Sequence, residues 1–347
     1  MSLSRTSLHP AVSVIVVNFN RVSLLRDCLQ SLARQEGVSC EWIVVDNGSS
    51  DGSAEMVEQE FPDAILIRNR ENLGFCAANN QGIQAARAEF VALLNNDAVA
   101  EPQWLYELLE ETRFSPMVGM VASKILVAGR PGVIDKVGHG IYWDGQNRGR
   151  GSGQVDCGQF DTQREILWPD GCAALYRKSM LDEIGAFDED FFAYADDADL
   201  GMRARCAGWR ARYAPWAVVH HHRGATMGKL NPKRIALIER NRVWLAVKHF
   251  PLWLLLLNPF FYGLRVLSGV VAGLTGKGEA GQARGIRAKM ELGLALLAAD
   301  WAALRGLPSM WRKRRAWRTR RRLSDKEVVA LMRQHLLTLD ELSKNVA

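Results

Sequence analysis

The sequence VSVIVVNFN occupies residues 12–20 and decides the fold class. Its first six residues are β-branched or small, which favours a buried strand, and the polar residues Asn18 and Asn20 follow directly. An amphipathic stretch with helical spacing comes next, near residues 22–35. A β-branched run, a polar break and a helix-like stretch together are the repeating unit of a parallel α/β sheet.

The same unit recurs along the first hundred residues. Further β-branched runs lie at 42–45, 64–67 and 90–94, and helical spacing returns near 52–60 and 76–87. This alternation predicts an α/β fold, with a mostly parallel, Rossmann-like sheet flanked by helices. Such sheets bind ligands beyond the carboxyl ends of their strands. The candidate binding residues are therefore the polar ones after each run, in 18–20, 46–51, 72–75 and 95–97.

The charge of the chain is divided unevenly between its two parts. The total is +6 over 347 residues, but residues 229–347 carry 23 Lys and Arg against 8 Asp and Glu, whereas residues 1–228 carry 21 against 30. With 48% hydrophobic residues the chain is not a disordered protein. We expect an acidic catalytic domain over 1–228, suited to metal and sugar chemistry, and a basic helical extension over 229–347, suited to an anionic membrane surface.

Two segments of the extension predict membrane association. The apolar stretch 250–274 is nearly long enough to cross a bilayer, but Pro259, Arg265 and several glycines interrupt it, so we expect it to lie in the interface, with a true span as the alternative. The run WRKRRAWRTRRR at 311–322 has eight cations and two tryptophans and would be attracted by anionic lipids. The alternative is a solvated basic tail. Nucleic acid is not expected as a partner, because no recognition motif accompanies the charge.

The cysteines and the N-terminus predict the compartment. Six cysteines are scattered without CxxC spacing, and the first residues lack the apolar segment of a secretory signal. We therefore expect reduced thiols and a cytoplasmic protein, held peripherally at the inner face of the cell membrane.

Two acidic clusters carry the candidate chemistry. Asp97 closes the buried run 90–94 beside Asn95, where oxygen ligands can hold Mg²⁺ or Mn²⁺ while phosphates complete the coordination shell; a helix cap is the alternative. The second cluster lies at 196–199, where Asp197 can take a proton from an attacking hydroxyl. Its alternative is a helix N-terminus enriched in acids. Asp199 precedes an arginine by four residues, which predicts a helical ion pair.

Six motifs, in family order and with family spacing, make residues 12–250 resemble the GT-A fold glycosyltransferases of family 2, especially the bacterial rhamnosyltransferase-like branch. The resemblance implies an inverting, metal-dependent transfer of a sugar, with rhamnose as the first to test, from a dTDP- or UDP-sugar to a hydroxyl of a lipid-linked or polysaccharide acceptor in cell-surface glycan synthesis. The motifs are VSVIVVNFN (12–20), VVDNGSSDGS (44–53), NLGFCAANNQGI (72–83), LLNNDA (93–98), IGAFDEDFFAYADDADLGMRARCAGW (184–209) and VHHHRGAT (219–226).

The resemblance also implies residue roles. Asp197 corresponds to the catalytic base, Asp97 and His221 to metal ligands, and Asn95 stands where the family's metal motif begins with aspartate. His220 and His222 flank His221, and because strand side chains alternate, not all three can face the site; plain surface residues are the alternative. Trp168 is equally a core candidate. Nucleotide-sugar binding falls to Asn18, Asp46, Asn72, Gly74, Asn79, Asn95 and Asn96, and acceptor binding to Trp168, Asp170, Gly171 and Asp196.

Two other functions stay open at this point. A nucleotidyltransferase could share the sheet, but no Gly-rich triphosphate loop followed by Lys lies near the first strand. A non-catalytic, membrane-attached subunit of a glycan assembly complex would not need both Asp97 and Asp197. No QxxRW motif follows the acidic cluster, and in related enzymes that motif goes with processive polymerisation, so one sugar per encounter is expected.

Overall fold

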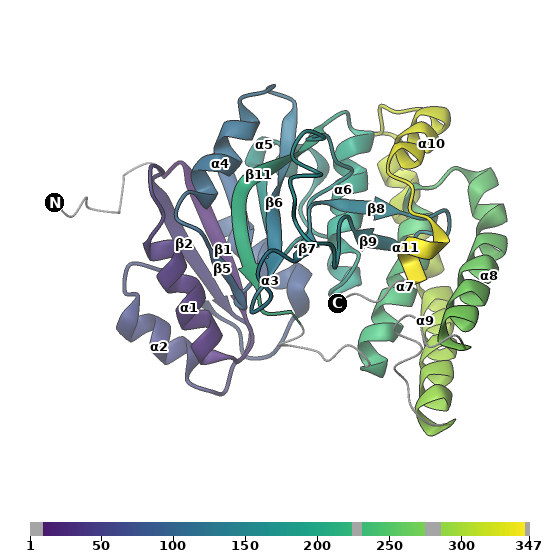
Figure 1. The fold of residues 1–347 in the computed structure, drawn as a ribbon, viewed down its shortest axis with the longest axis horizontal. Helices are drawn as coiled ribbons and strands as arrows, with labels where there is room; N and C mark the ends of the chain where they lie inside the picture. The colour runs from purple at the N-terminus through teal and green to yellow at the C-terminus, as the bar shows by residue number, and fades with distance from the viewer. Residues whose placement is uncertain (1–9, 224–230, 275–285, 344–347) are drawn as a thin grey trace.

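The computed structural model describes residues 10–223, 231–274 and 286–343. Its centre is a nine-stranded mixed sheet in the order β3-β2-β1-β4-β10-β6-β11-β5, with β7 paired to β6 (Figure 1). The strands are β1 (Val12–Asn18), β2 (Cys40–Asp46), β3 (Ile65–Arg68), β4 (Phe90–Leu94), β5 (Ala98–Ala100), β6 (Val118–Val127), β7 (Ile134–Lys136), β10 (Ala173–Arg177) and β11 (Arg210–His221).

The first four strands confirm the predicted parallel α/β units. β1 pairs in parallel with both β2 and β4, and β2 pairs in parallel with β3. The register places Asn18 opposite Asp46, so the polar residues after these strands gather at one edge of the sheet. Antiparallel pairing appears where β10 enters between β4 and β6.

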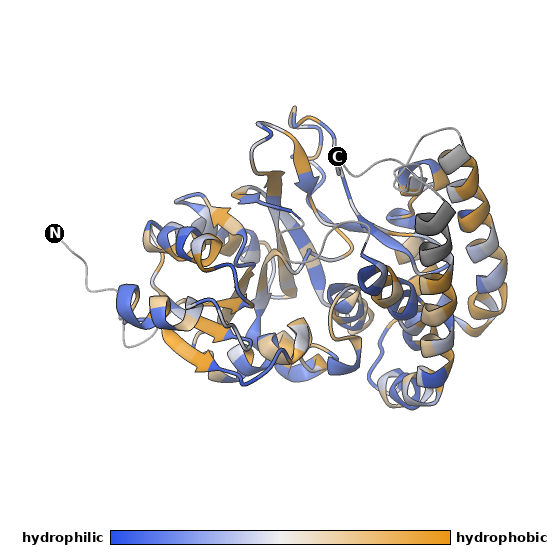
Figure 2. Ribbon diagram, turned by 90° about the horizontal axis from the view of Figure 1, so that it is seen from below, coloured by the Kyte–Doolittle hydropathy of each residue, from blue (hydrophilic) through white to orange (hydrophobic). Residues whose placement is uncertain are grey.

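Helices cover both faces of the sheet because its strands alternate their apolar side chains. Val14 and Val16 join one hydrophobic cluster with Leu25, whereas Ile15 points into the cluster on the opposite face. Gly82 lets its helix approach closely, since a Cβ there would lie 2.6 Å from Ile15 Cγ2. Figure 2 shows hydrophobic colour in these interior strands. The helices are α1 (Val22–Ala33), α2 (Ser53–Glu60), α3 (Gly74–Ala85), α4 (Trp104–Thr112), α5 (Lys178–Ile184), η1 (Glu189–Phe191) and α6 (Asp196–Cys206).

The C-terminal region is helical, as predicted, and lies together on one side of the sheet (Figure 1). Its first helix is tied to the segment before α6: the Asn241 side chain donates to the carbonyl oxygens of Phe191, Ala193 and Tyr194 at 2.7–2.9 Å. These contacts fix the segment that leads into α6. The helices are α7 (Pro232–His249), α8 (Leu252–Leu274), α9 (Ile286–Arg318), α10 (Asp325–Gln334) and α11 (Leu339–Ser343).

The basic run at 311–322 is not a free tail. Its first part continues α9, and Lys313 forms ion pairs with Asp188 and Asp190. Arg314 is 2% exposed and donates to the carbonyl oxygen of Val247 at 2.7 Å. The solvated-tail alternative is therefore wrong, and part of the charge expected to meet lipid is instead used inside the protein.

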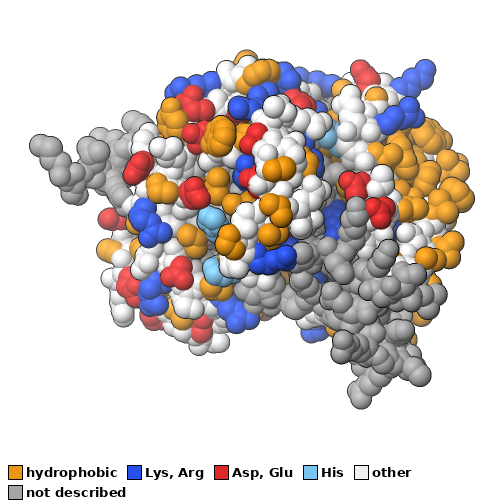
Figure 3. Space-filling model, in the orientation of Figure 1, with side chains coloured by type: hydrophobic (Ala, Val, Ile, Leu, Met, Phe, Trp, Pro, Cys, Tyr) orange, Lys and Arg blue, Asp and Glu red, His pale blue; other side chains and the backbone are white. Residues whose placement is uncertain are grey.

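α8 exposes most of its apolar surface. Among the described residues, Leu252–Ala272 forms one helix that is long and apolar enough to cross a membrane by length and composition alone. Leu256 is 82% exposed and Phe260 is 60% exposed. Figure 3 shows hydrophobic side chains gathered over this helix.

The glycine-rich segment 145–153 contains a short strand. β9 (Asn147–Gly149) pairs antiparallel with β8 (His139–Ile141). This hairpin stands beside α7 and α8 and forms one wall of the site described next.

Candidate active site

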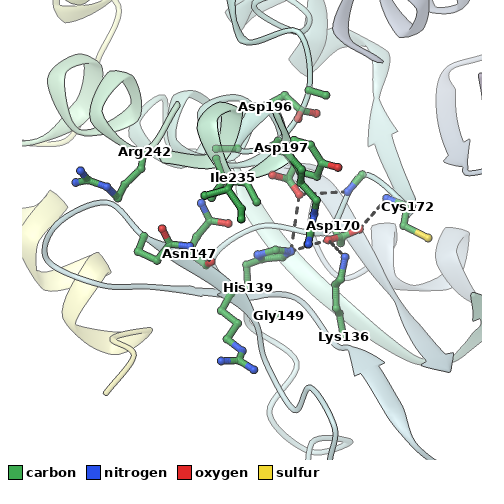
Figure 4. A pocket seen from close by; sticks show the side chains of 18 of the residues that line it. Lys136, His139, Asn147, Gly149, Asp170, Cys172, Asp196, Asp197, Ile235 and Arg242 are labelled. Atoms are coloured by element: carbon green, nitrogen blue, oxygen red, sulfur yellow. Dashed lines mark hydrogen bonds and ion pairs between the residues drawn. The ribbon is translucent and has the colours of Figure 1, made fainter. Parts of the chain in front are cut away.

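One cavity of about 730 Å³ lies at the carboxyl ends of the central strands. Asp97, which follows β4, and Asp197, in the first turn of α6, both line it. They are a hundred positions apart in the chain, and their convergence on one cavity is what the sequence hypothesis requires. Figure 4 shows the Asp197 end, where Asp196, Asp197 and Asp170 approach one another from α6 and the loop before β10.

His221 joins Asp97 to a carboxylate that the sequence analysis missed. Its Nε2 lies 3.3 Å from Asp97 Oδ1, and its Nδ1 lies 2.7 Å from Oδ2 of the fully buried Asp135 on β7. Successive side chains of a strand point to opposite faces, so His220 and His221 cannot both face the cavity. The side chain of His220 points outward, is 41% exposed and pairs with Glu101 at 3.1 Å. His221 is therefore the histidine that faces the cavity.

The surroundings of Asp97 keep its carboxylate charged. Burial by itself would raise the pKa of Asp97, but the hydrogen bond and charge of His221 outweigh it and hold the pKa below the ordinary value. Burial likewise opposes charge on His221, yet Cys172, Asp135 and Asp97 raise the pKa of its imidazole well above the usual range. The site thus favours a negative carboxylate beside a cation.

The donor set around Asp97 fits a divalent cation. The carboxylate of Asp97, the imidazole of His221 and the amide of Asn95 all line the cavity. Mn²⁺ accepts both oxygen and nitrogen ligands, whereas Mg²⁺ prefers the oxygen ligands. Asp135 holds the other ring nitrogen of His221 at 2.7 Å. A carboxylate in that position orients a metal-binding histidine.

The second acidic cluster has the opposite electrostatic character. Burial raises the pKa of Asp197, and burial together with the neighbouring Asp197 charge raises the pKa of Asp196 well above its ordinary value. Asp197 Oδ2 accepts a hydrogen bond from the backbone N–H of Gly171 at 3.4 Å. A carboxylate with raised proton affinity, held at a cavity wall, has the properties of a general base.

Asp170 lies beside this pair and is linked to it through His139. Its Oδ2 contacts Lys136 Nζ at 2.6 Å and His139 Nε2 at 2.8 Å, and although burial opposes its charge, Lys136 and His139 hold its pKa well below the usual range. His139 Nε2 is also 3.7 Å from Asp197 Oδ2. Lys136 and His139 belong to no sequence motif, and the sequence analysis missed both.

The atoms of His139, Asp170 and Asp197 lie close enough together to be considered as a metal site. The ammonium group of Lys136, 2.6 Å from Asp170 Oδ2, would repel a cation there. Asp97 forms no ion pair with a lysine or arginine among the described residues, and a bound cation would take the place of the proton on His221 Nε2, so this part of the cavity fits a metal better.

The predicted nucleotide-binding residues divide into two groups. Asn72, Gly74, Asn95 and Asn96 line the cavity. Asn18, Asp46 and Asn79 do not, and Asn18 and Asn79 use their side chains within the protein. Asn18 Nδ2 donates to Asp46 Oδ1 at 3.1 Å, and its Oδ1 accepts from Asn96 at 2.7 Å. Asn79 donates to the carbonyl oxygen of Phe75.

Asp46 is likewise buried, and its Oδ2 accepts a hydrogen bond from the backbone N–H of Ser49 at 3.0 Å. Direct nucleotide contact by Asn18 and Asn79 stays a prediction. Contact between Asp46 and the base stays a prediction. For Trp168 the structure favours the core alternative: its side chain is fully buried, packs on Gly201 and stacks on His139, with ring centroids 6.2 Å apart. Gly171, Asp170 and Asp196 line the cavity.

The strand order and the cavity at the strand ends define the class of protein. Mannosyltransferase PcManGT from Pyrobaculum calidifontis, solved in complex with GDP-Man and Mn²⁺, superposes with a TM-score of 0.52 at 20% identity, over 88% of this chain and 89% of that one. At this identity the likeness establishes the fold, which is the GT-A glycosyltransferase fold.

Sequence comparison then gives the family. The model named Glycosyl transferase family 2 matches residues 13–185. The N-acetylglucosaminyl-diphospho-decaprenol L-rhamnosyltransferase of Mycobacterium tuberculosis is 27% identical over 245 residues, which are 64% of this chain and 79% of that protein. The uncharacterized protein y4gI of Sinorhizobium fredii is 29% identical over 63% of this chain, and the match spans only 25% of that protein. The chain belongs to glycosyltransferase family 2 and is a glycosyltransferase.

Proposed function

We propose that this enzyme transfers one sugar, with inversion and with the help of a divalent cation, from a dTDP- or UDP-sugar to a hydroxyl group of a saccharide acceptor in cell-surface glycan synthesis. The observation that carries the proposal is one cavity lined by both Asp97 and Asp197, whose carboxyl pKa values are shifted in opposite directions. The similarity to a rhamnosyltransferase supports dTDP-rhamnose as the first donor to test.

The mechanism follows from the two acidic clusters. Asp97 and His221 would hold Mg²⁺ or Mn²⁺, which when bound neutralises the diphosphate of the donor. Asn72, Asn95 and Asn96 line the same cavity, which supports a role for them in binding the nucleotide sugar. Asp197 takes the proton of the acceptor hydroxyl as that oxygen attacks the anomeric carbon, opposite the departing diphosphate, so the configuration inverts.

Asp196 and Asp170 support that step in different ways. Burial and the charge of Asp197 both raise the pKa of Asp196. The two neighbouring carboxyl groups therefore titrate as a pair. Asp170 remains charged between Lys136 and His139 and lines the acceptor side as a hydrogen-bond acceptor for sugar hydroxyls.

The extension fits a protein that rests on the inner face of the membrane. Arg265, in the middle of α8, pairs with Asp144 at 2.6 Å and with Glu239 at 2.7 Å. A helix crossing the bilayer would have to break or bury these ion pairs in lipid, which is costly. We therefore propose that α8 lies along the membrane surface with its exposed apolar side toward lipid, and that the domain boundary falls near residue 228.

Release of nucleoside diphosphate from a panel of sugar nucleotides, with and without Mn²⁺, tests the function. The proposal expects diphosphate release that depends on the metal and on one donor. Pyrophosphate released from a nucleoside triphosphate would instead identify a nucleotidyltransferase. Neither product, from a folded protein that also binds no sugar nucleotide, would identify a non-catalytic subunit.

A further inference from the structure

The imidazole of His139 contacts two of the acids that line the cavity. His139 lies on β8 and is buried, and its Nε2 lies 2.8 Å from Asp170 Oδ2 and 3.7 Å from Asp197 Oδ2. Figure 4 shows both contacts as dashed lines. A buried imidazole this close to a reacting carboxylate affects the charge and the orientation of that group, because the interior screens their interaction only weakly.

Packing fixes the His139 ring relative to the helix that carries Asp197. The ring stacks on Trp168 with centroids 6.2 Å apart and an interplanar angle of 26°, and the backbone N–H of His139 donates to the carbonyl oxygen of Trp168 at 3.2 Å. Trp168 in turn lies against α6, since a Cβ at Gly201 would come within 2.3 Å of Trp168 Cβ. The buried Trp168 therefore connects β8 to α6, and a tilt of the imidazole would disturb this packing.

Asp170 determines where the imidazole carries its hydrogen. The backbone N–H of Cys172 donates to Asp170 Oδ1 at 2.9 Å, and although burial opposes its charge, Lys136 and His139 keep the pKa of Asp170 well below the usual range. A charged carboxylate 2.8 Å from Nε2 requires a hydrogen on that nitrogen. Nδ1 is buried and has no hydrogen-bond partner among the described residues. The ring therefore directs no lone pair at Asp197 and cannot take the acceptor proton in its place.

Several titratable side chains surround Asp197. They are Asp196 on α6, Asp170 before β10, Tyr176 on β10, Lys136 on β7 and His139 on β8. Burial raises the pKa of Asp197, and His139 is the strongest influence in the opposite direction. Asp170 adds to the effect of burial, whereas Lys136 opposes it more weakly than His139 does. Among these side chains, His139 contributes most to keeping Asp197 charged.

We propose that His139 is a positioning residue for the base of the transfer reaction: anchored by Asp170 and by the stack on Trp168, it keeps Asp197 charged and oriented toward the acceptor hydroxyl. The inference rests on the proposed function, in which Asp197 is that base. The proton passes from the acceptor oxygen to Asp197 as the bond to the anomeric carbon forms and the bond to the diphosphate breaks, and His139 neither gains nor loses a proton. Its contribution therefore falls on the rate of transfer and not on donor binding.

Two substitutions separate the polar role of the ring from its packing role. His139→Gln keeps an N–H near the position of Nε2 but loses the stack on Trp168, whereas His139→Phe keeps an aromatic ring and loses the N–H. His139→Phe should lower kcat at least about 30-fold and His139→Gln less than about fivefold, with donor affinity within about twofold of the wild type in both. A ring that served only for packing would give the reverse order. The reverse order, or equal losses in the two variants, refutes the proposal.

The titration of Asp197 measures the electrostatic part of the effect. Because His139 lowers the pKa of Asp197, its removal raises that pKa, and the acidic limb of the kcat profile should move to higher pH by at least about half a unit in His139→Phe. The same shift should appear without any substrate in a ¹³C NMR titration of protein labelled at its aspartate carboxyl groups, in which Asp197→Asn identifies the resonance. An Asp197 titration that does not move in His139→Phe overturns the proposal.

His249→Phe is the matched control. His249 is also buried and contacts an acid of α6, with its Nε2 2.8 Å from Asp199 Oδ1, but neither side chain lines the cavity. Asp199 keeps Arg203 and Lys248 as partners, so His249→Phe should cost stability without moving the titration of Asp197. Equal shifts in the two Phe variants refute a specific role for His139. If His139→Phe does not fold, His139→Met takes its place, because its flexible side chain fills the same space without an N–H.

Failure of this inference and failure of the function give different results. Diphosphate release that Asp197→Asn abolishes but His139→Phe leaves unchanged refutes the role of His139 and leaves the function standing. A titration of Asp197 that shifts in His139→Phe, in a protein that turns over no sugar nucleotide, refutes glycosyl transfer and leaves the link between His139 and Asp197 standing.

Discussion

The cluster around Asp97 and the cluster around Asp197 use the same side chain in opposite electrostatic settings. At Asp97, the His221 imidazole outweighs burial and lowers the carboxyl pKa. At Asp197 burial prevails, and the adjacent Asp196 has its pKa raised well above the ordinary value. When the surroundings shift the pKa values of two carboxyl groups in opposite directions, the two groups are suited to different roles. The Asp97 cluster is suited to holding a cation, and the Asp197 cluster to receiving a proton.

The largest expected effect comes from Asp197→Asn. The amide keeps the shape of the side chain but cannot accept the hydroxyl proton, so kcat should fall at least about 10³-fold while donor affinity stays within about twofold. Initial rates of diphosphate release and equilibrium binding of the donor measure both quantities. Wild-type turnover in this variant would remove Asp197 from the mechanism.

Asp97→Asn should act on the other cluster and mainly on binding. Loss of the anionic ligand should weaken Mn²⁺ binding about 100-fold, and donor binding with it, because a bound cation would neutralise the charge of the donor diphosphate. Mn²⁺ electron paramagnetic resonance measures the metal affinity without any turnover. If Asp97→Asn loses turnover but binds Mn²⁺ as the wild type does, the cation is held elsewhere and the contrast between the two clusters is wrong.

Asp135→Asn sharpens the assignment of His221. The amide can still contact His221 Nδ1, but it no longer supplies the charge that orients the imidazole and increases its basicity. Mn²⁺ affinity should fall about tenfold, with a smaller change in kcat at saturating metal. A drop in kcat that added Mn²⁺ does not restore would point to a role for Asp135 outside metal binding.

The smallest effect is expected from Asp196→Asn, and it is measured as a change in thermal stability with pH. Because folding raises the pKa of Asp196, the native state binds its proton more tightly than the unfolded chain does, and stability falls as pH rises from about 4 toward the native pKa. Removing the acid should leave Tm unchanged near pH 4 and raise it by about 2–4 °C at pH 8, which corresponds to about 1 kcal/mol. Thermal unfolding at both pH values measures this, and a lower Tm at pH 8 would show that Asp196 is stabilising when charged.

The parts predictable from sequence are those with local signals. Strands β1 to β4 follow from β-branched runs, and Asp97 follows from its position directly after β4. The ion pair of Asp199 with Arg203, observed at 2.9 Å, follows from helical spacing. The positions of Asp197 and His221 could be proposed because they fall within recognisable motifs, although their catalytic and metal-binding roles stay predictions.

The parts that could not be predicted depend on long-range pairing. Asp135 lies on the three-residue strand β7 and meets His221 across 86 positions of chain. Lys136 and His139 reach Asp170 in the same way, across 34 and 31 positions. Short strands in a segment without periodicity carry no local signal for such contacts. Trp168 was ambiguous for another reason, since an aromatic residue beside an acid suits a sugar site and a core equally.

The clamp between α7 and the segment before α6 has a consequence for any attempt to shorten the protein. Tyr194 and Ala195 adopt left-handed backbone conformations, with φ of 68° and 55°, and the Asn241 amide holds carbonyl groups of this segment in place. Lys248 also neutralises the fully buried Asp199 at 2.5 Å. A version trimmed at residue 228 to gain solubility would therefore discard the restraint that keeps Asp197 aimed into the cavity, and it would leave a buried acid short of a counter-ion.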